Sequence, residues 1–224
     1  MPNGPSLRAI QTFVGRPAAI GETRNGAVVS AIHKLLVEDT TLELSPINLA
    51  GDDQADRSVH GGPEKAVYCY PSEHAAAWQA DGFELPPGAV GENISVAGAR
   101  EADVRIGDTF RWGTATMQIS QPRAPCFKLT IFSGRKDVGP HLIETKRSGW
   151  YVRVLTPGTV ETSGPLEFVG RDAAAPTVAE TFAVMFPGVH PEADDADLVR
   201  RVVQCALLSP EWLGAVLARN PLAH

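Results

Sequence analysis

The sequence predicts a mainly β fold, either a barrel or a sandwich, followed by a small helical segment. From Leu7 to about Val169, glycine and proline separate short runs rich in Val, Ile, Phe and Thr, which is typical of many short strands. After Arg171, the linker 173–176 leads into stretches with the caps and spacing of helices. With 224 residues, 43% of them hydrophobic, the chain can bury one sizeable core and carry a small appendage.

Several strands can be placed from their patterns. One strand is expected at 28–32 after a turn, and another at 65–70 before a proline. The clearest element is a hairpin over 108–120, in which apolar and polar residues alternate after Gly113. This hairpin delivers the chain directly to the segment Gln121-Pro-Arg-Ala-Pro-Cys126.

Short helices are expected between the strands and at the end of the chain. Ser72 can cap a helix over 73–78, and another helix is expected near 136–146. In the tail, Thr177-Val-Ala-Glu180 forms a capping box for an apolar helix. Acidic residues suit the start of a second helix, whose expected apolar face consists of Val199, Val203 and Leu207. Ser209 begins a third helix.

Charge and cysteine usage argue against several function classes. Twenty Lys and Arg against 26 Asp and Glu give a formal charge of −6, which disfavours nucleic acid and anionic membranes as partners. The sequence shows no membrane span and no secretory signal, so a cytoplasmic location is expected. The three cysteines form no Cys-x-x-Cys pair, so neither a disulfide framework nor a cysteine-only zinc site is favoured. No metal-binding histidine spacing occurs, and the histidines interpreted as surface or packing residues are His74, His141, His190 and His224.

Two glycine-containing segments offer polar groups to a ligand. The loop 56–65 holds Arg57, His60 and Lys65, and its glycines would let backbone N–H groups and the two cations approach a phosphate. The same composition also suits a solvated loop with a β-bulge. Gly91-Glu-Asn-Ile94 offers a carboxylate and an amide, although taken alone it is typical of an ordinary turn.

The segment around Cys126 carries the strongest chemical signal. Two prolines stiffen its backbone, and Arg123 and Lys128 flank the thiol. Positive neighbours favour the thiolate, which is the form that acts as a nucleophile or a metal ligand. The alternative is that Cys126 is a small buried hydrophobe, the common state of a free cysteine. Cys69 and Cys205 lie in apolar strand and helix patterns and are assigned to the core.

Four segments taken together resemble the motifs of the MOSC domain, in its YiiM-like branch. They occur in family order at 49–67, 91–94, 106–108 and 120–129. The terminal helices resemble the small three-helix domain that follows the barrel in that branch, so the resemblance covers nearly the whole chain. It implies a MOSC-type β-barrel with short peripheral helices at 1–170 and a three-helix domain at 171–224.

The resemblance implies a pyranopterin molybdenum cofactor (molybdopterin). Cys126 matches the family cysteine, so it would be the catalytic residue and would give the metal a soft protein thiolate. The residues that would line the pocket or bind the pterin and its phosphate are Ser30, Lys34, Arg57, His60, Lys65, Asn93 and Arg123. Binding of pyridoxal phosphate is also associated with the wider family.

The implied activity is that of an oxidoreductase that reduces small N-hydroxylated compounds, such as N-hydroxylated purines. Electrons would come from a separate reductase, because the chain lacks both a Gly-x-Gly-x-x-Gly fingerprint and the clustered cysteines of an iron–sulfur domain. A first alternative is a carrier of the molybdenum cofactor or of sulfur without reductase activity, since MOSC domains also occur in cofactor sulfurases. A second alternative is a barrel that serves only as a binding module.

Overall fold

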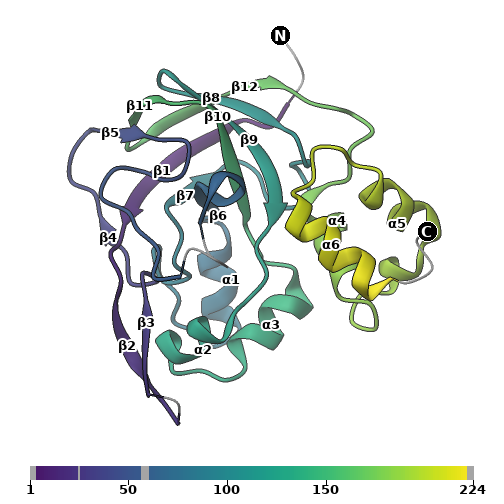
Figure 1. Ribbon diagram of the computed structural model, residues 1–224, viewed down its shortest axis with the longest axis horizontal. Helices are drawn as coiled ribbons and strands as arrows, with labels where there is room; N and C mark the ends of the chain where they lie inside the picture. The colour runs from purple at the N-terminus through teal and green to yellow at the C-terminus, as the bar shows by residue number, and fades with distance from the viewer. Residues whose placement is uncertain (1–3, 25, 57–60, 221–224) are drawn as a thin grey trace.

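Figure 1 shows the computed structural model, which describes residues 4–24, 26–56 and 61–220. Within these residues, seven strands close into a barrel in the order β12-β8-β9-β10-β6-β7-β1, and β4 extends the sheet beside β1. Two smaller ribbons pair β11 with β5 and β2 with β3. The strands are β1 (Leu7–Val14), β2 (Ala18–Thr23), β3 (Gly26–Ser30), β4 (Leu35–Leu36), β5 (Thr41–Leu44), β6 (Val67–Pro71), β7 (Ile94–Ala97), β8 (Thr109–Trp112), β9 (Ala115–Pro122), β10 (Trp150–Thr156), β11 (Gly158–Glu161) and β12 (Gly164–Gly170). The helices are α1 (His74–Ala80), α2 (Phe127–Ser133), α3 (Val138–Thr145), α4 (Val178–Met185), α5 (Ala196–Val203) and α6 (Pro210–Arg219), with 3-10 turns η1 (Pro63–Lys65) and η2 (Pro191–Asp194).

Strand β1 closes the barrel because it pairs on both of its sides. Its first residues are antiparallel to β12, with Leu7 opposite Leu166, and its later residues are antiparallel to β7, with Thr12 opposite Ile94. A closed sheet satisfies the backbone groups that an open edge would leave for another chain. The prediction of a mainly β barrel is confirmed, and the sandwich alternative is excluded.

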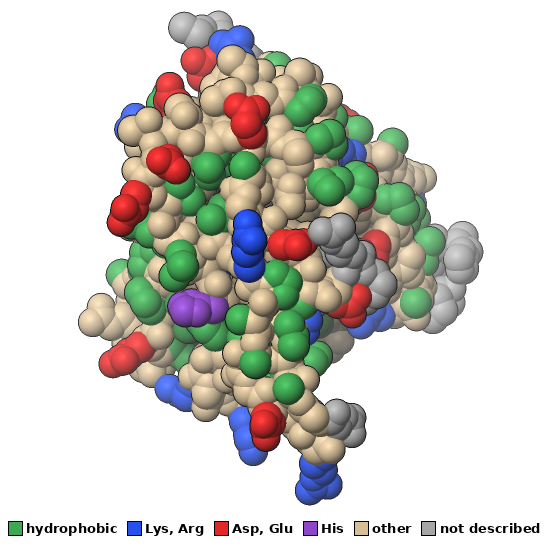
Figure 2. All heavy atoms as spheres, turned by 60° about the vertical axis from the view of Figure 1, so that its left-hand side comes forward, with side chains coloured by type: hydrophobic (Ala, Val, Ile, Leu, Met, Phe, Trp, Pro, Cys, Tyr) green, Lys and Arg blue, Asp and Glu red, His purple; other side chains and the backbone are tan. Residues whose placement is uncertain are grey.

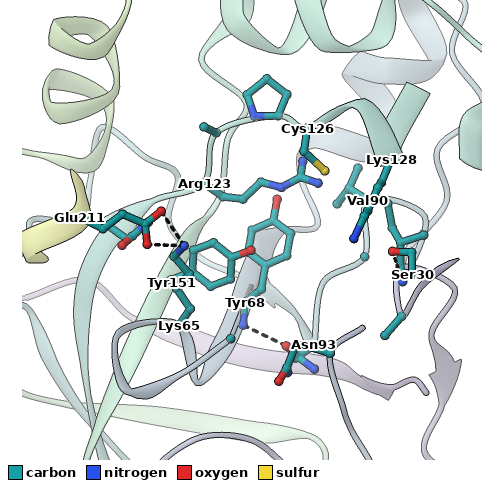
Figure 3. A pocket seen from close by; sticks show the side chains of 18 of the residues that line it. Ser30, Lys65, Tyr68, Val90, Asn93, Arg123, Cys126, Lys128, Tyr151 and Glu211 are labelled. Atoms are coloured by element: carbon teal, nitrogen blue, oxygen red, sulfur yellow. Dashed lines mark hydrogen bonds and ion pairs between the residues drawn. The ribbon is translucent and has the colours of Figure 1, made fainter. Parts of the chain in front are cut away.

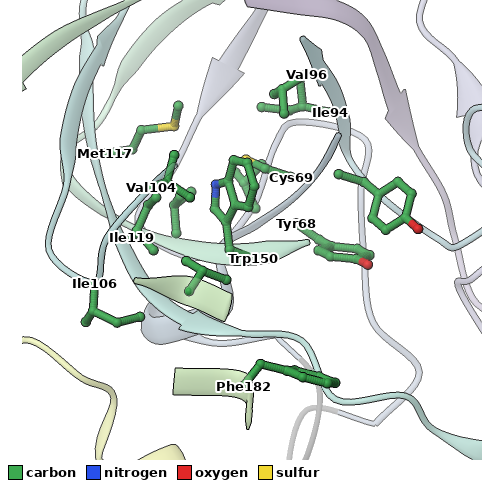
Figure 4. Close-up of a cluster of buried hydrophobic side chains, with 14 of the residues drawn as sticks. Tyr68, Cys69, Ile94, Val96, Val104, Ile106, Met117, Ile119, Trp150 and Phe182 are labelled. Atoms are coloured by element: carbon green, nitrogen blue, oxygen red, sulfur yellow. The ribbon is translucent and has the colours of Figure 1, made fainter. Parts of the chain in front are cut away.

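Large apolar side chains fill the barrel interior, as Figure 4 shows. Trp150 of β10 stands opposite Cys69 of β6 in the sheet register, and both are buried beside Met117 and Ile119 of β9. The assignment of Cys69 to the core is therefore confirmed. Burial raises the pKa of the Cys69 thiol to about 12, which keeps this cysteine protonated and chemically inert near neutral pH.

The hairpin predicted at 108–120 is confirmed as β8 and β9. Its turn contains Gly113, where φ is 57° and a Cβ atom would lie only 2.3 Å from the carbonyl oxygen of Thr159. Glycine is therefore favoured at this position both by the positive φ angle and by the lack of room for a Cβ atom. The hairpin ends at Pro122, so it delivers the chain to Cys126 as the sequence indicates.

Two predicted strand boundaries are wrong. The strand expected at 28–32 ends at Ser30, because β3 forms a ladder with β2 from its first residue and the chain turns away afterwards. The strand expected at 65–70 begins at Val67, since the preceding proline opens a 3-10 turn that ends at Lys65.

The peripheral helices differ from the prediction mainly at their starts. Helix α1 begins at His74 without a side-chain cap, because the backbone N–H of Ser72 donates to Val96 O at 2.7 Å and continues the sheet pairing of β6. The predicted cap at Ser72 is therefore wrong. The helix expected near 136–146 is confirmed as α3. Helix α2, which begins directly after Cys126, has no counterpart among the predicted helices.

Three capped helices form the tail, as predicted. Thr177 and Glu180 make both hydrogen bonds of the capping box of α4, and Ser209 Oγ caps α6 by accepting from the backbone N–H of Trp212. The apolar face predicted for the second helix is confirmed in part. Val199 and Val203 lie on α5 and pack against the core, as do its buried residues Leu198 and Val202, but α5 ends at Val203 and Leu207 lies beyond it. Cys205 also lies beyond α5, so the helical position predicted for it is wrong, although the half-buried residue packs against the core.

The helical tail packs against the barrel through backbone hydrogen bonds. The N–H of Val178 donates to Val104 O at 3.0 Å, and the N–H of Ser209 donates to Ser120 O at 3.0 Å. Figure 1 shows the three helices together beside the ends of β9 and β10. The division into domains at residue 170 stays a prediction.

Among the described residues, no helix has the length and apolar character needed to cross a membrane. Figure 2, which brings β2 to β5 forward, shows apolar side chains interspersed with charged ones on that face.

Candidate functional site

A cavity of about 400 Å³ lies between the barrel and the helical tail. Its barrel side comes from the loops after β3 and before η1 and from the segment that follows β9, while α4 and α6 supply its tail side. This volume falls within the range of about 300–1,000 Å³ that is usual for small-molecule sites. Figure 3 shows the side chains that converge on it.

Cys126 is positioned on this cavity by the connection between β9 and α2. Its backbone is extended and its carbonyl oxygen accepts from the N–H of Leu129 at 3.0 Å, which opens the first turn of α2. The half-buried thiol lines the cavity, and Figure 3 shows it facing the same space as the guanidinium of Arg123. The alternative that Cys126 is a sealed hydrophobe is therefore excluded.

Arg123 brings a buried cation to the same space. The residue is 6% exposed, and its guanidinium lies over the ring of Tyr68 at 5.3 Å from the centroid. Nη1 is buried and has no hydrogen-bond partner among the described residues. A buried donor without an acceptor costs about 1–3 kcal/mol, more when it is charged, so this atom is suited to an acceptor atom of a bound ligand.

A second buried cation, Lys34, is held by a network around Asp52. Lys34 Nζ lies 2.5 Å from Asp52 Oδ1, and the second carboxylate oxygen accepts from Asn93 Nδ2 at 2.9 Å. Burial lowers the pKa of Lys34 although Asp52 opposes the shift. Asn93 Oδ1 accepts from the backbone N–H of Tyr68 at 3.1 Å, so both ends of this amide are occupied by the protein. Asn93 therefore positions Asp52, and Lys34 presents the charge.

The helical tail contributes an ion pair at the cavity. Lys65 is buried, and its Nζ lies 2.6 Å from a carboxylate oxygen of Glu211 on α6, as the dashed lines in Figure 3 mark. Among the described lining residues, five side chains are cationic and three are anionic. The cations are Lys34, Lys65, Arg123, Lys128 and Arg219. An acidic chain thus keeps a local excess of positive charge at one site, which favours an anionic ligand.

Two phenols complete the wall beside Arg123. Burial raises the pKa values of Tyr68 and Tyr151, so both hydroxyl groups stay neutral. Tyr68 Oη donates to Ser148 O at 2.8 Å, which fixes its ring under the guanidinium. No carboxylate among the described residues forms an ion pair with Arg123, so its charge remains available to a ligand.

Most of the site residues predicted from the sequence converge on this cavity. Those that line it are Ser30, Lys34, Lys65, Asn93, Arg123 and Cys126. Arg57 and His60 lie outside the described residues. Sequence reasoning missed Asp52, although it lies in the motif at 49–67 and offered that signal. It also missed Tyr68, Tyr151, Glu211 and Trp212, which no local pattern marks as ligand-facing.

The histidines predicted to be surface or packing residues have these positions wherever the structure describes them. His74 Nε2 lies 2.8 Å from Glu101 Oε2 in a buried pair, and His190 Nε2 lies 2.8 Å from Ile143 O. His141 contacts Asp81 at the surface, and His224 lies outside the described residues. In the described part of the chain, no three His, Cys, Asp or Glu side chains come together as a metal site.

Comparison with known proteins assigns this chain to a family. Residues 56–167 match the MOSC domain, and the chain belongs to the MOSC domain family. It is 41% identical over 197 residues to protein YiiM of Escherichia coli strain K12, a match that covers 85% of this chain and 84% of that protein. The crystal structure of YiiM from Geobacillus stearothermophilus is similar, with a TM-score of 0.76 and 30% identity over 95% of this chain and 98% of that chain.

These matches place the chain in the YiiM-like branch and confirm the MOSC-type barrel with short peripheral helices. The chain is also 35% identical over 140 residues to a protein of Gibberella moniliformis named Reductase. That match covers 60% of this chain and 25% of the fungal protein.

Proposed function

We propose that this protein is a molybdenum-cofactor-dependent oxidoreductase that reduces small N-hydroxylated compounds. The observation that carries the proposal is the thiol of Cys126, which opens onto a cation-rich cavity instead of packing in the core. The name of the fungal relative, Reductase, is consistent with redox chemistry on this fold. A cytoplasmic location belongs to the proposal, because free thiols suit a reducing compartment.

The side chains fit a pterin-bound molybdenum on chemical grounds. Cys126 offers one soft thiolate, which suits a metal that receives its other soft ligands from a dithiolene. Arg123 Nη1 is a buried charged donor that lacks an acceptor among the described residues, and the phosphate of the cofactor would supply one. Lys34 and Lys65 add positive charge on the two flanks of the cavity.

The chemistry divides between the cofactor and the chain. When bound, the cofactor would supply the two electrons needed to cleave the N–O bond. A separate reductase would then return two electrons to the cofactor. Reduction of an N-hydroxyl group to the amine consumes two electrons and two protons and releases water. In this reaction Cys126 would hold the metal, Arg123 and Lys65 would hold anionic groups, and the buried Lys34–Asp52 pair would keep a protonated amine at the cavity wall.

The proposal is tested by comparing Cys126→Ser with a matched serine variant at another half-buried cysteine, Cys205→Ser. Both proteins are produced in cells that make the molybdenum cofactor, and molybdenum content and turnover of N6-hydroxyadenine with a reduced artificial donor are measured. Wild type and Cys205→Ser should contain molybdenum and form adenine, whereas Cys126→Ser should fold but show little turnover. Full activity of Cys126→Ser would overturn the proposal. Wild-type protein that binds molybdenum but never reduces the substrate would instead identify a cofactor carrier.

A further inference from the structure

Trp212 differs from Trp78 and Trp112 in its hydrogen bonding. It lies in the first turn of α6, lines the cavity and is 4% exposed. Its indole Nε1 is buried and has no hydrogen-bond partner among the described residues. By contrast, Trp78 Nε1 donates to Tyr70 Oη at 2.6 Å, and Trp112 Nε1 donates to Glu161 O at 2.7 Å. A buried indole N–H normally finds an acceptor, so its absence at Trp212 calls for a cause.

The unsatisfied donors gather at one place. Four buried side-chain atoms lack a partner among the described residues, and two of these are oxygens of Glu73 and Glu92, which are not among the residues that line the cavity. The other two are Arg123 Nη1 and Trp212 Nε1, which belong to residues lining the same cavity. One comes from the barrel and the other from the helical tail. Two donors left unmatched in one cavity indicate a ligand that brings acceptor atoms.

The backbone of Trp212 is tied to the strand that leads to Cys126. Its backbone N–H donates to Ser209 Oγ at 3.2 Å, and this hydroxyl donates to Gln121 Oε1 at 2.6 Å. Gln121 belongs to β9, the strand that leads to Cys126. The start of α6 is therefore tied to the same strand end that positions the thiol.

The tail side of the cavity combines apolar and charged residues. Met185, Phe186 and Ala215 line the cavity together with Trp212, and the charged Glu211 and Arg219 also belong to this side. Figure 3 places Glu211, the neighbour of Trp212, at the opposite side of the cavity from Ser30 and Val90, with Cys126 and Arg123 between them. A wall of this kind suits a flat, uncharged ring, whereas the cations of the barrel suit an anionic group.

We propose that Trp212 is a substrate-binding residue, whose indole N–H donates a hydrogen bond to a ring nitrogen of a flat, N-hydroxylated heterocyclic base. This inference rests on the proposed function and names a specificity-determining residue of the same site. The helical tail thereby determines specificity, because a substrate without a ring acceptor leaves the N–H unpaired.

The test compares Trp212→Phe with wild type as molybdenum-loaded proteins. Phenylalanine keeps an aromatic ring but removes the donor. Two substrates are used: N6-hydroxyadenine, which has ring nitrogens, and benzamidoxime, whose ring has none. Loss of one uncharged hydrogen bond should raise KM for N6-hydroxyadenine about three- to tenfold and leave KM for benzamidoxime nearly unchanged. Adenine binding, measured by calorimetry, should weaken by the same factor.

Stability of the cofactor-free protein gives a second measurement, with Trp112→Phe as the matched control. Both replacements shrink a buried side chain and should lower Tm, but Trp112→Phe also loses a hydrogen bond, so its Tm should fall further than that of Trp212→Phe. A fall in Tm as large as that of Trp112→Phe would show a protein partner for the Trp212 indole and would overturn the inference.

The remaining outcomes separate this inference from the proposed function. If wild type reduces both compounds and Trp212→Phe has unchanged KM values, the inference fails while the proposed function stands. If Trp212→Phe loses molybdenum, the N–H binds the cofactor instead of the substrate, and the inference is again wrong. If wild type reduces neither compound, the proposed function itself fails.

Discussion

Replacing Asp52 with asparagine removes the charge that compensates Lys34 inside the protein. The two side chains are almost fully buried, with 7% of the Lys34 side chain and 1% of the Asp52 side chain exposed. Asp52 Oδ1 accepts from Lys34 Nζ at 2.5 Å and from the N–H of Gly15 at 2.8 Å, and Oδ2 accepts from Asn93 Nδ2 at 2.9 Å. Both oxygens are therefore acceptors, and an asparagine can supply only one.

The cost follows from these contacts. The NH₂ group of an asparagine would face a donor, either at Lys34 and Gly15 or at Asn93, and the Lys34 ammonium would lose its charge partner. Removal of one partner from a buried ion pair costs about 3–5 kcal/mol. In a chain of this size, 1 kcal/mol lowers Tm by about 2–4 °C, so Asp52→Asn should lower Tm by about 6–20 °C.

Thermal unfolding and urea titration at pH 7.5 measure this effect. Asp137→Asn, which breaks an exposed pair with Arg135, serves as the control and should leave Tm almost unchanged. The double variant Lys34→Met/Asp52→Asn should lose less stability than the two single variants together, because it leaves no buried charge. A loss below about 1 kcal/mol for Asp52→Asn would show that Lys34 is neutral or hydrated, and would refute this account of the network.

Three further predictions concern ionisation and capping. Burial lowers the pKa of Lys34 below 10.5, so keeping this amine protonated costs stability at neutral pH, and the cost disappears as pH rises through the lowered pKa. In urea titrations at increasing pH, the free energy of unfolding of wild type should therefore rise relative to that of Lys34→Met up to about pH 10.5. The same pH dependence in both proteins would contradict the shift. Iodoacetamide at pH 8, followed by peptide mass spectrometry, should find Cys126 labelled in the native protein and Cys69 unlabelled. The pKa of Cys69 is about 12, so this thiol forms on the order of a thousandfold less thiolate than it would at its usual pKa of 9.0. Native labelling of Cys69 would contradict its burial. Thr177→Ala should cost about 1 kcal/mol by removing the capping box with Glu180, and an unchanged urea midpoint would mean that this cap contributes nothing.

The candidate site could be located from the sequence because its signals are local. Cys126 follows two prolines and is flanked by Arg123 and Lys128, and this setting distinguishes it from Cys69 in an apolar strand. Cys205 shows where such reasoning fails. Its apolar neighbours suggested a helix face, but α5 ends at Val203 and the thiol falls in the following turn, because helix termination depends on how the tail packs.

The residues that complete the cavity could not be read from local patterns. Lys65 meets Glu211 across 146 positions of sequence, and Trp212 reaches the cavity only because Ser209 binds Gln121, 88 positions earlier. Contacts of this kind depend on barrel closure and on docking of the tail, both of which are set by the packing of distant apolar surfaces.

Sequence and tertiary structure therefore account for different parts of this protein. Strand alternation, the turn at Gly113 and the caps at Thr177 and Ser209 arise from interactions within a few residues, so the linear order of amino acids already specifies them. Closure of the barrel, the buried charge network at Asp52 and the aromatic wall at Trp212 arise only when remote segments meet. Their energies depend on burial and distance, which exist only in the folded chain.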